Sequence, residues 1–452
     1  MAAEDTFSYL GMDVDGAEGT LACHYGLGLY SFTERISLGE GLEWGPVARE
    51  AARLVYLLAG VSYYKAAPAP VLDLGNTPVR DAEIDFLRTF YVEGLGEYAY
   101  RNQLDLGALR VEGGVRIAGG GSGAGAGGGS GAGADPPSPS RPLIPFGGGL
   151  DSIVTVESIR HRVDDAALFV LSRPGDRFAA IEACAAVSGL PVVRAGRELD
   201  GQILRSAELG WRNGHVPITG ILSAIAVLSA ALHGRDAVVM SNEWSASVGN
   251  VRVDDRWVNH QWSKSLEFEE RFAAVVGVAL DASVGYFSAL RPHTELWIAE
   301  RFAALERYHP VFRSCNRAFA VEPSRRMDEW CGVCDKCCFV DLVLAPFLPA
   351  ERLRAIFSGR EPLDDLGLAE RFRTLVALSP DIKPWECVGD TDESRAALVL
   401  AAARPDRAAT PLLHTLVAEL GAGAAAARAL VPALLRPAGA HHVPADLVLA
   451  AS

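Results

Sequence analysis

The middle of the chain alternates short apolar runs with longer segments of helical period. The apolar runs have the length and composition of buried strands and cover residues 143–146, 167–171, 191–194 and 237–240. The helical segments cover residues 152–161, 179–188 and 218–233. This alternation predicts an α/β fold with a doubly wound parallel sheet, in which ligands bind at the carboxyl ends of the strands.

The regions on either side have different patterns. Residues 1–118 contain alternating runs at 21–25 and 31–37 and helical periods at 47–58 and 84–100, which predict an N-terminal α+β unit. Residues 119–140 read GGGSGAGAGGGSGAGADPPSPS and predict a flexible linker, because they offer nothing to bury. We therefore expect the parallel-sheet domain at 141–345 and a helical C-terminal region at 346–452.

Composition and charge narrow the class of function. The 452 residues are 49% hydrophobic and 22% charged, which is typical of a globular protein with two or three domains. A formal net charge of -14 disfavours a nucleic-acid partner. The acidic start MAAEDTFSYL is unlike a signal peptide, and the apolar stretch at 218–232 is too short to span a membrane. We expect a soluble cytoplasmic protein without a membrane partner; its oligomeric state is not indicated.

A glycine-rich loop follows the first strand of the parallel sheet. Gly147, Gly148 and Gly149 allow a tight turn of backbone N–H groups, and Asp151 and Ser152 begin the next helix. The run lacks the Lys-Ser/Thr pair of a Walker motif. It resembles the SGGxDS signature of PP-loop ATP pyrophosphatases, with Gly147 in place of the first Ser. The resemblance implies ATP binding at these five residues; the alternative is a strand-to-helix turn without a ligand.

Four of the eight cysteines lie between positions 331 and 338, which in a reducing compartment indicates a metal site or redox chemistry. Cys331, Cys334 and Cys337 form a C-x-x-C-x-x-C run that, together with Cys315, can surround one structural Zn²⁺. The arrangement resembles the zinc site of 7-cyano-7-deazaguanine synthases. Free thiols or an iron–sulfur cluster are the alternatives, and Cys338 is expected to be a packed thiol.

Four further motifs extend the resemblance to most of residues 1–345. They are GVSYYK at 60–65, NGHVP at 213–217, SNE at 241–243 and NHQWSKS at 259–265. Together with the loop and the cysteine run, they resemble the UDP-N-acetyl-α-D-muramoyl-L-alanyl-L-glutamate epimerase family. Membership implies inversion of the terminal L-Glu of a cell-wall precursor to D-Glu, with ATP and Mg²⁺ as cofactors. Adenylation of the terminal carboxylate would make the α-proton accessible and release pyrophosphate and AMP.

Inversion needs a proton acceptor on one face of the α-carbon and a donor on the other. Candidates at predicted strand or helix ends are Glu243, His215, His260 and Lys264. Each has another interpretation. Glu243 could bind Mg²⁺ or cap a helix, the two histidines could satisfy local hydrogen bonds, and Lys264 could pair with the UDP phosphates.

The UDP-muramoyl dipeptide substrate is expected to contact a second set of residues, namely Tyr63, Tyr64, Lys65 and Asn242. An aromatic pair that follows an apolar run is also typical of core packing. Two other functions remain open. One is a different PP-loop adenylating enzyme, such as a deazaguanine nitrile synthase or a tRNA-modifying thiolase, and the other is an inactive, zinc-stabilised nucleotide-binding protein.

Overall fold

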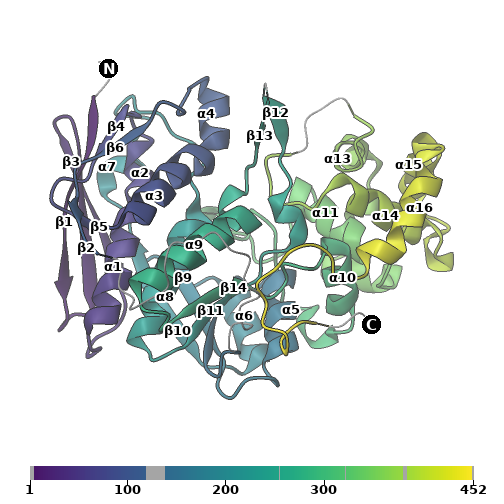
Figure 1. Cartoon of the computed structure of the whole chain (residues 1–452). Coiled ribbons are helices and arrows are strands. Elements are labelled where there is room, and N and C mark those ends of the chain that lie inside the picture. Colours follow the sequence, from purple (N-terminus) through teal and green to yellow (C-terminus); the bar gives the residue numbers. More distant parts are fainter. Residues whose placement is uncertain (1–4, 119–137, 254, 321, 380–383, 450–452) are drawn as a thin grey trace, which may run out of the picture.

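The computed structural model describes residues 5–118, 138–253, 255–320, 322–379 and 384–449. Within these ranges, ten strands form one mixed sheet in the order β14-β11-β8-β9-β10-β3-β2-β1-β4-β6 (Figure 1). Most of residues 119–140, the predicted linker, lie outside the described residues, which resume at 138.

Five neighbouring strands of this sheet are parallel to one another. They are β8 (Pro142–Pro145), β9 (Ala167–Ser172), β10 (Val192–Glu198), β11 (Ala237–Met240) and β14 (Gly285–Ser288). The chain moves outward from β8 through β9 to β10, and then returns to the other side of β8 with β11 and β14. This reversal places a crevice beside the carboxyl ends of β8 and β11.

Helices cover both faces of the parallel strands. On one face lie α5 (Leu150–Ile159) and α6 (Ala179–Ser188), and on the other lie α8 (Ile218–Leu232) and α9 (Leu266–Ala279). The strands supply alternate residues to the two cores: in β9, Phe169 packs with the α8 side and Leu168 with the α5 side. The predicted parallel strands and helices are therefore confirmed, although β10 continues to Glu198 and α5 begins at Leu150.

The N-terminal unit adds an antiparallel meander to this sheet. It consists of β1 (Thr6–Asp15), β2 (Thr20–Leu27) and β3 (Tyr30–Ser37), and β1 also pairs with β4 (Val71–Asp73), which pairs with β6 (Arg110–Glu112). The helices of the unit are α1 (Pro46–Ala59), α2 (Val61–Tyr64), α3 (Asp81–Gly94) and α4 (Gly96–Asn102), of which α1 packs on α8. Because β3 pairs with β10, one sheet runs through both regions, whether or not they fold as separate domains.

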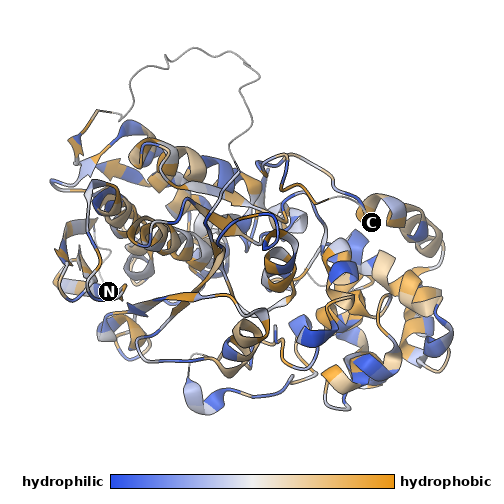
Figure 2. Ribbon diagram, turned by 90° about the horizontal axis from the view of Figure 1, so that it is seen from below, coloured by the Kyte–Doolittle hydropathy of each residue, from blue (hydrophilic) through white to orange (hydrophobic). Residues whose placement is uncertain are grey.

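The C-terminal region is helical in the structure, as its composition predicts. Its helices are α12 (Ala350–Ile356), α13 (Ala369–Leu375), α14 (Thr391–Ala402), α15 (Pro411–Leu420) and α16 (Gly423–Leu434), and they follow α10 (Glu295–Ala303) and α11 (Asp335–Leu344), which lie before residue 346. Hydrophobic and hydrophilic residues mix along these helices (Figure 2). No single described helix is long and apolar enough to cross a membrane; α15 and α16 together reach the required length and composition but are bent by 101°.

A buried ion pair joins the N-terminal meander to the parallel strands. Arg197 in β10 makes a bidentate contact with Glu34 in β3, with Nε–Oε1 and Nη2–Oε2 distances of 2.8 and 3.0 Å. The Glu34 side chain is fully buried, and the Arg197 side chain is 9% exposed. Arg197 also donates to the Ser62 hydroxyl. The pair therefore fixes the register at which the two regions share one sheet.

We expect Glu34→Gln to lower the free energy of unfolding by about 3–5 kcal/mol, because it leaves the buried Arg197 without its counter-charge. Urea unfolding followed by circular dichroism would measure the change. Glu208→Gln is the matched control, since it breaks the exposed pair with Arg205 and should change stability by less than about 0.5 kcal/mol. Equal stability of the two variants would contradict a structural role for the buried pair between Glu34 and Arg197.

Candidate active site

A cavity of about 320 Å³ lies at the crevice where the strand order reverses. It is bounded by the loop after β8, by the ends of β9 and β11, and by the start of α8. Among its lining residues are several that the sequence singled out: Gly147, Gly149, Asp151, Ser152, Asn242 and Lys264. The sequence motifs thus converge on one site.

The glycine loop has the geometry of an anion-binding turn. Gly148 adopts a left-handed φ of +70°, which favours glycine, and a Cβ on Gly149 would lie 2.7 Å from the Ser314 hydroxyl, which would have to move. A Cβ on Gly147 would meet no atom within 4 Å. Gly149 is the N-cap residue of α5, and the loop therefore presents backbone donors and a positive helix end to the cavity.

Three carboxylates gather around Asp151, which lines the cavity. Asp151, Glu243 and Glu295 place one oxygen each within 4.8 Å of one another. Burial and the charge of Glu243 raise the pKa of Asp151 to about 6, although Lys336 and Lys264 oppose the shift. Carboxylate oxygens at this spacing are suitable ligands for a hard divalent cation such as Mg²⁺.

Two lysines and a thiol lie beside these carboxylates. Lys264, the last residue of the short 3-10 helix Trp262–Lys264, donates from Nζ to the Sγ atom of Cys387 at 3.2 Å. Lys336 in α11 donates to the backbone carbonyl of Cys387 and lies 3.9 Å from Glu295. Burial alone would lower the pKa of Lys264, but Cys387 and Glu243 outweigh it and raise the pKa, so this lysine is a cation.

Two histidines lie against each other near Lys264. The rings of His215 and His260 are 4.4 Å apart, and His260 Nδ1 is 2.5 Å from Glu97 Oε2, an N–O separation too short for both atoms to bind one metal ion. Burial and the charge of His260 lower the pKa of His215 to about 4. Burial opposes the charge on His260, but hydrogen bonds to Cys387 and Glu97 prevail and raise its pKa to about 9. Near neutral pH the pair is therefore one neutral imidazole and one imidazolium.

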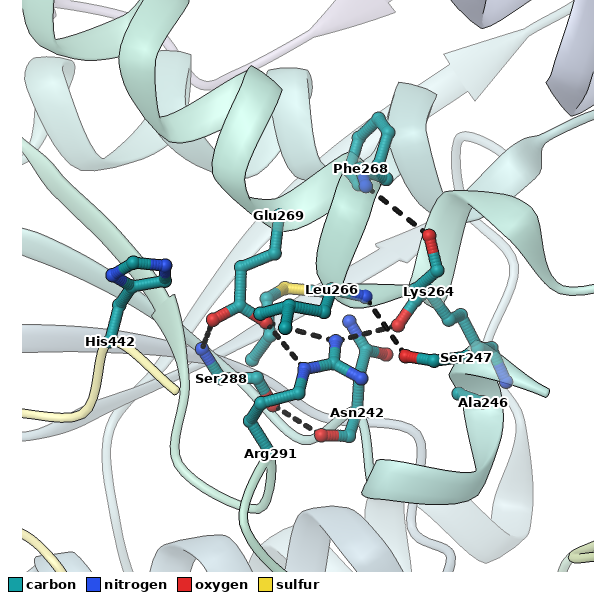
Figure 3. Close-up of polar contacts among 12 residues, drawn as sticks. Asn242, Ala246, Ser247, Lys264, Leu266, Phe268, Glu269, Ser288, Arg291 and His442 are labelled. Atoms are coloured by element: carbon teal, nitrogen blue, oxygen red, sulfur yellow. Dashed lines mark hydrogen bonds and ion pairs between the residues drawn. The ribbon is translucent and has the colours of Figure 1, made fainter. Parts of the chain in front are cut away.

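The loops that carry Glu243 and Lys264 are held by one arginine (Figure 3). Arg291 is 1% exposed and donates to the backbone carbonyls of Glu243 and Lys264 at 2.7 and 2.6 Å. Its Nε atom donates to Glu269 Oε2 at 2.9 Å. Glu269 in turn accepts from the Ser288 backbone N–H at the end of β14. One buried ion pair thus connects β14, α9 and both loops.

The four predicted zinc ligands come together in the structure. Sγ atoms of Cys331 and Cys337 are 3.6 Å apart, those of Cys334 and Cys337 are 3.4 Å apart, and Cys315 accepts a hydrogen bond from the Cys331 backbone N–H. Tetrahedral Zn²⁺ with Zn–S bonds near ~2.3 Å requires S–S separations of about 3.8 Å. The donor set and its spacing fit a closed structural zinc site. Cys338 is a buried thiol outside this set, as expected.

The two tyrosines predicted to bind substrate have a different role. Tyr63 and Tyr64 are buried in the core, where Tyr63 stacks on Tyr25 and the Tyr64 hydroxyl donates to the Ala69 carbonyl. Because they are buried, they present no surface to a ligand. Their hydroxyl groups form hydrogen bonds inside the protein. Lys65 is accessible and donates to Asn213 in the loop that carries His215.

Several residues of the site carry no sequence motif. Glu97, Glu295, Lys336 and Cys387 come from distant segments and meet the predicted residues only in the fold. Arg313 also lines the cavity, next to the glycine loop, and adds a positive charge there. Among these residues, only Lys336 has a local indication of its place in the site, because it lies inside the cysteine run.

The fold and site define an α/β protein with a polar, charge-rich cavity at the switch point of a parallel sheet. Residues 1–289 match the family model of the MurL N-terminal domain, and residues 311–430 match that of the MurL C-terminal domain. The chain therefore belongs to the MurL family.

Three relatives are each named UDP-N-acetyl-alpha-D-muramoyl-L-alanyl-L-glutamate epimerase. The protein from Xanthomonas oryzae pv. oryzae is 40% identical over 359 residues, which are 79% of this chain and 76% of the relative. Those from a Micromonospora species and from Salinispora tropica are each 36% identical, over 97% and 91% of this chain and 96% and 88% of the relatives.

We expect Arg291→Met to cost about 3–5 kcal/mol of unfolding free energy, because it leaves Glu269 buried without a counter-charge and frees two backbone carbonyls. Urea unfolding measures the cost. Arg271→Met, on the helix α9 that carries Glu269, removes exposed pairs with Glu267 and Asp85 and should cost less than about 0.5 kcal/mol. A stability loss no larger than that of the control would show that Arg291 does not hold the two loops.

Proposed function

We propose that this protein inverts the terminal L-Glu of UDP-MurNAc-L-Ala-L-Glu to D-Glu by first adenylating its α-carboxylate with ATP. The observation that carries the proposal is a cavity lined by both the glycine loop and Lys264, whose Nζ atom donates to Cys387, a neighbour of the paired His215 and His260 rings. The names of the relatives supply the substrate. A PP-loop type of fold is part of this proposal and is supported by the strand order and the loop.

Adenylation would lower the electrostatic cost of removing the α-proton. Loss of the α-proton places negative charge next to a carboxylate, and two unit charges ~4 Å apart repel by about 4 kcal/mol at an effective dielectric constant of 20. That energy corresponds to about three powers of ten in rate. An acyl adenylate lacks the opposing charge and withdraws electrons, so an ordinary side chain becomes basic enough to remove the proton.

The loop residues have defined tasks in this reaction. The backbone N–H groups of residues 147–149 and the start of α5 would hold the phosphates, and Arg313 and Lys264 would balance their charge. The apolar residues Leu171, Ile181 and Met240 line the same cavity and fit a flat base such as adenine. A Cβ at position 147 would have open space around it, so the loop can hold either serine or glycine there. Glycine in place of the first serine of the signature is therefore a weak argument for an inactive site.

The carboxylate trio fits Mg²⁺. Asp151, Glu243 and Glu295 would hold the ion beside the phosphates, where a bound divalent cation supplies charge neutralisation. The three carboxylates lie close together without enough nearby positive charge to balance them, which agrees with a divalent cation bound between them. In this account Glu243 is a metal ligand, and proton transfer falls to the groups around Lys264, His215 and His260.

The direct test combines the purified protein with ATP, MgCl₂ and UDP-MurNAc-L-Ala-L-Glu, and follows AMP and the configuration of glutamate. The proposal requires AMP release that depends on this dipeptide, together with D-Glu. AMP formation with another acceptor would instead indicate a different adenylating enzyme, and no AMP with any acceptor would indicate a binding protein. Inversion that proceeds without ATP would contradict the adenylate.

We expect Asp151→Asn and Ser152→Ala to lower AMP formation by about 100-fold or more while the fold is kept, because both groups face the phosphates or Mg²⁺. The rate of AMP release is the measurement. Asp81→Asn is the control: Asp81 also lies in the first turn of a helix, but its side chain is 92% exposed. Turnover near that of the parent protein in both loop variants would remove the glycine loop from the reaction.

We expect about one Zn²⁺ per chain by elemental analysis, and we expect Cys334→Ser to lose it and to unfold at lower temperature, because metal binding stabilises the local fold. Cys338→Ser is the comparison, since its thiol is buried but belongs to no ligand set. Iron in place of zinc, or zinc retained in the Cys334→Ser variant, would contradict this assignment.

A further inference from the structure

Cys387 is a thiol with an unusual environment. It lies in the segment between α13 and α14, outside the four-cysteine zinc set, and it is partly exposed, in contrast to the buried Cys23, Cys184 and Cys338. Its Sγ atom accepts a hydrogen bond from Lys264 Nζ at 3.2 Å. Lys264 lines the cavity, so the thiol is one hydrogen bond away from the space in which the activated carboxylate would lie.

The thiol is also the end of a polar chain. His260 is hydrogen-bonded to Cys387, and its Nδ1 atom is 2.5 Å from the Glu97 carboxylate. Glu97 comes from α4, His260 from the loop after β13 (Arg256–Val258), and Cys387 from the C-terminal region. Three distant segments therefore bring together a carboxylate, an imidazole and a thiol, a combination of groups that activates thiols in other proteins.

The segment around Cys387 is fixed in place. Asn250 Nδ2 donates to the Pro384 carbonyl at 3.2 Å, and Asn316 Nδ2 donates to Glu386 at 2.7 Å. Lys336 binds the Cys387 carbonyl itself. These contacts come from different parts of the fold and orient one side chain toward Lys264.

The thiol is ionised at neutral pH. Burial raises its pKa, but the charge of Lys264, the hydrogen bond from His260 and the charge of Lys336 outweigh burial and lower the pKa to about 6. A thiolate beside two cations can accept a proton.

The geometry points to Cys387 as the group that takes the α-proton from the L-configured glutamyl adenylate, an inference that rests on the function proposed above. The Cα–H bond breaks, its electron pair enters the enolate of the acyl adenylate, and the proton forms the S–H bond of Cys387. A solvent-derived proton then forms the new C–H bond on the opposite face, and the thiol returns its proton to solvent. Lys264 and His260 act as positioning residues for the thiolate.

The test uses the full chain with Cys387→Ala and Cys387→Ser, incubated with ATP, MgCl₂ and the L-Glu dipeptide in D₂O. We expect AMP release to persist, since adenylation does not involve the thiol, and inversion to fall by at least about 100-fold. Recovered substrate should carry no deuterium at the α-carbon. Cys23→Ala, in the core of β2, is the control and should keep both activities.

Inversion close to the parent rate in Cys387→Ala would overturn the inference, and so would a parallel loss of AMP release and inversion in a variant with an unchanged circular dichroism spectrum. Failure of the proposed function is a separate result, because the parent protein itself would then release no AMP in response to the dipeptide.

Alkylation of the unmodified protein provides a test that does not depend on folding of a variant. Iodoacetamide followed by peptide mapping should modify Cys387 before Cys23 and Cys184, and inversion should be lost in step with that modification while AMP release continues. Alkylated Cys387 with full inversion would contradict the inference. So would an acyl thioester on Cys387 in acid-quenched protein, which would make the thiol a nucleophile instead of a proton acceptor.

Discussion

The arrangement of the cavity depends on the buried ion pair between Arg291 and Glu269. Both side chains are nearly inaccessible, with exposures of 1% and 2%, so neither charge would be stable there alone. The cost of burial is offset because the guanidinium also binds the backbone carbonyls of Glu243 and Lys264, and Glu269 binds the Ser288 amide. A charge pair in the core thereby fixes the backbone that carries a carboxylate of the trio and the central lysine.

The consequence is a cavity in which charges are sorted by position. The carboxylates of Asp151, Glu243 and Glu295 gather beside the glycine loop, while the rings of His215 and His260 form a second group and Cys387 accepts a hydrogen bond from Lys264. In the proposed reaction, activation of a carboxylate and removal of its α-proton involve neighbouring atoms of one substrate, so the two sets of groups must be adjacent without neutralising each other. Lys264 interacts with Cys387 and with two of the carboxylates, Glu243 and Asp151.

The sequence predicts those parts of the site that depend on local order. The strands are predicted correctly, and the glycine loop and the cysteine run are recognisable as candidate sites, because each lies within a few consecutive residues; Cys315 joins the run from 16 positions before Cys331. Glu97 and His260 are 163 positions apart, and no local pattern indicates that they share a hydrogen bond. For Tyr63 and Tyr64 the sequence leaves both substrate binding and core packing open, because tyrosine is suited to core and surface, and the fold shows that their hydroxyl groups have partners inside the protein. Cys387 lies in a loop whose sequence carries no motif. The environment of its thiol is set by Lys264 and His260, which are far from it in the sequence.

The central claim is that adenylation precedes removal of the α-proton. Incubation of the L-Glu dipeptide with the protein in D₂O, with and without ATP and MgCl₂, tests this order most directly when deuterium at the α-carbon is followed by mass spectrometry. The account predicts no deuterium without ATP, and deuterium that appears together with D-Glu and AMP when ATP and MgCl₂ are present. Deuterium at the α-carbon in the complete absence of nucleotide would contradict it.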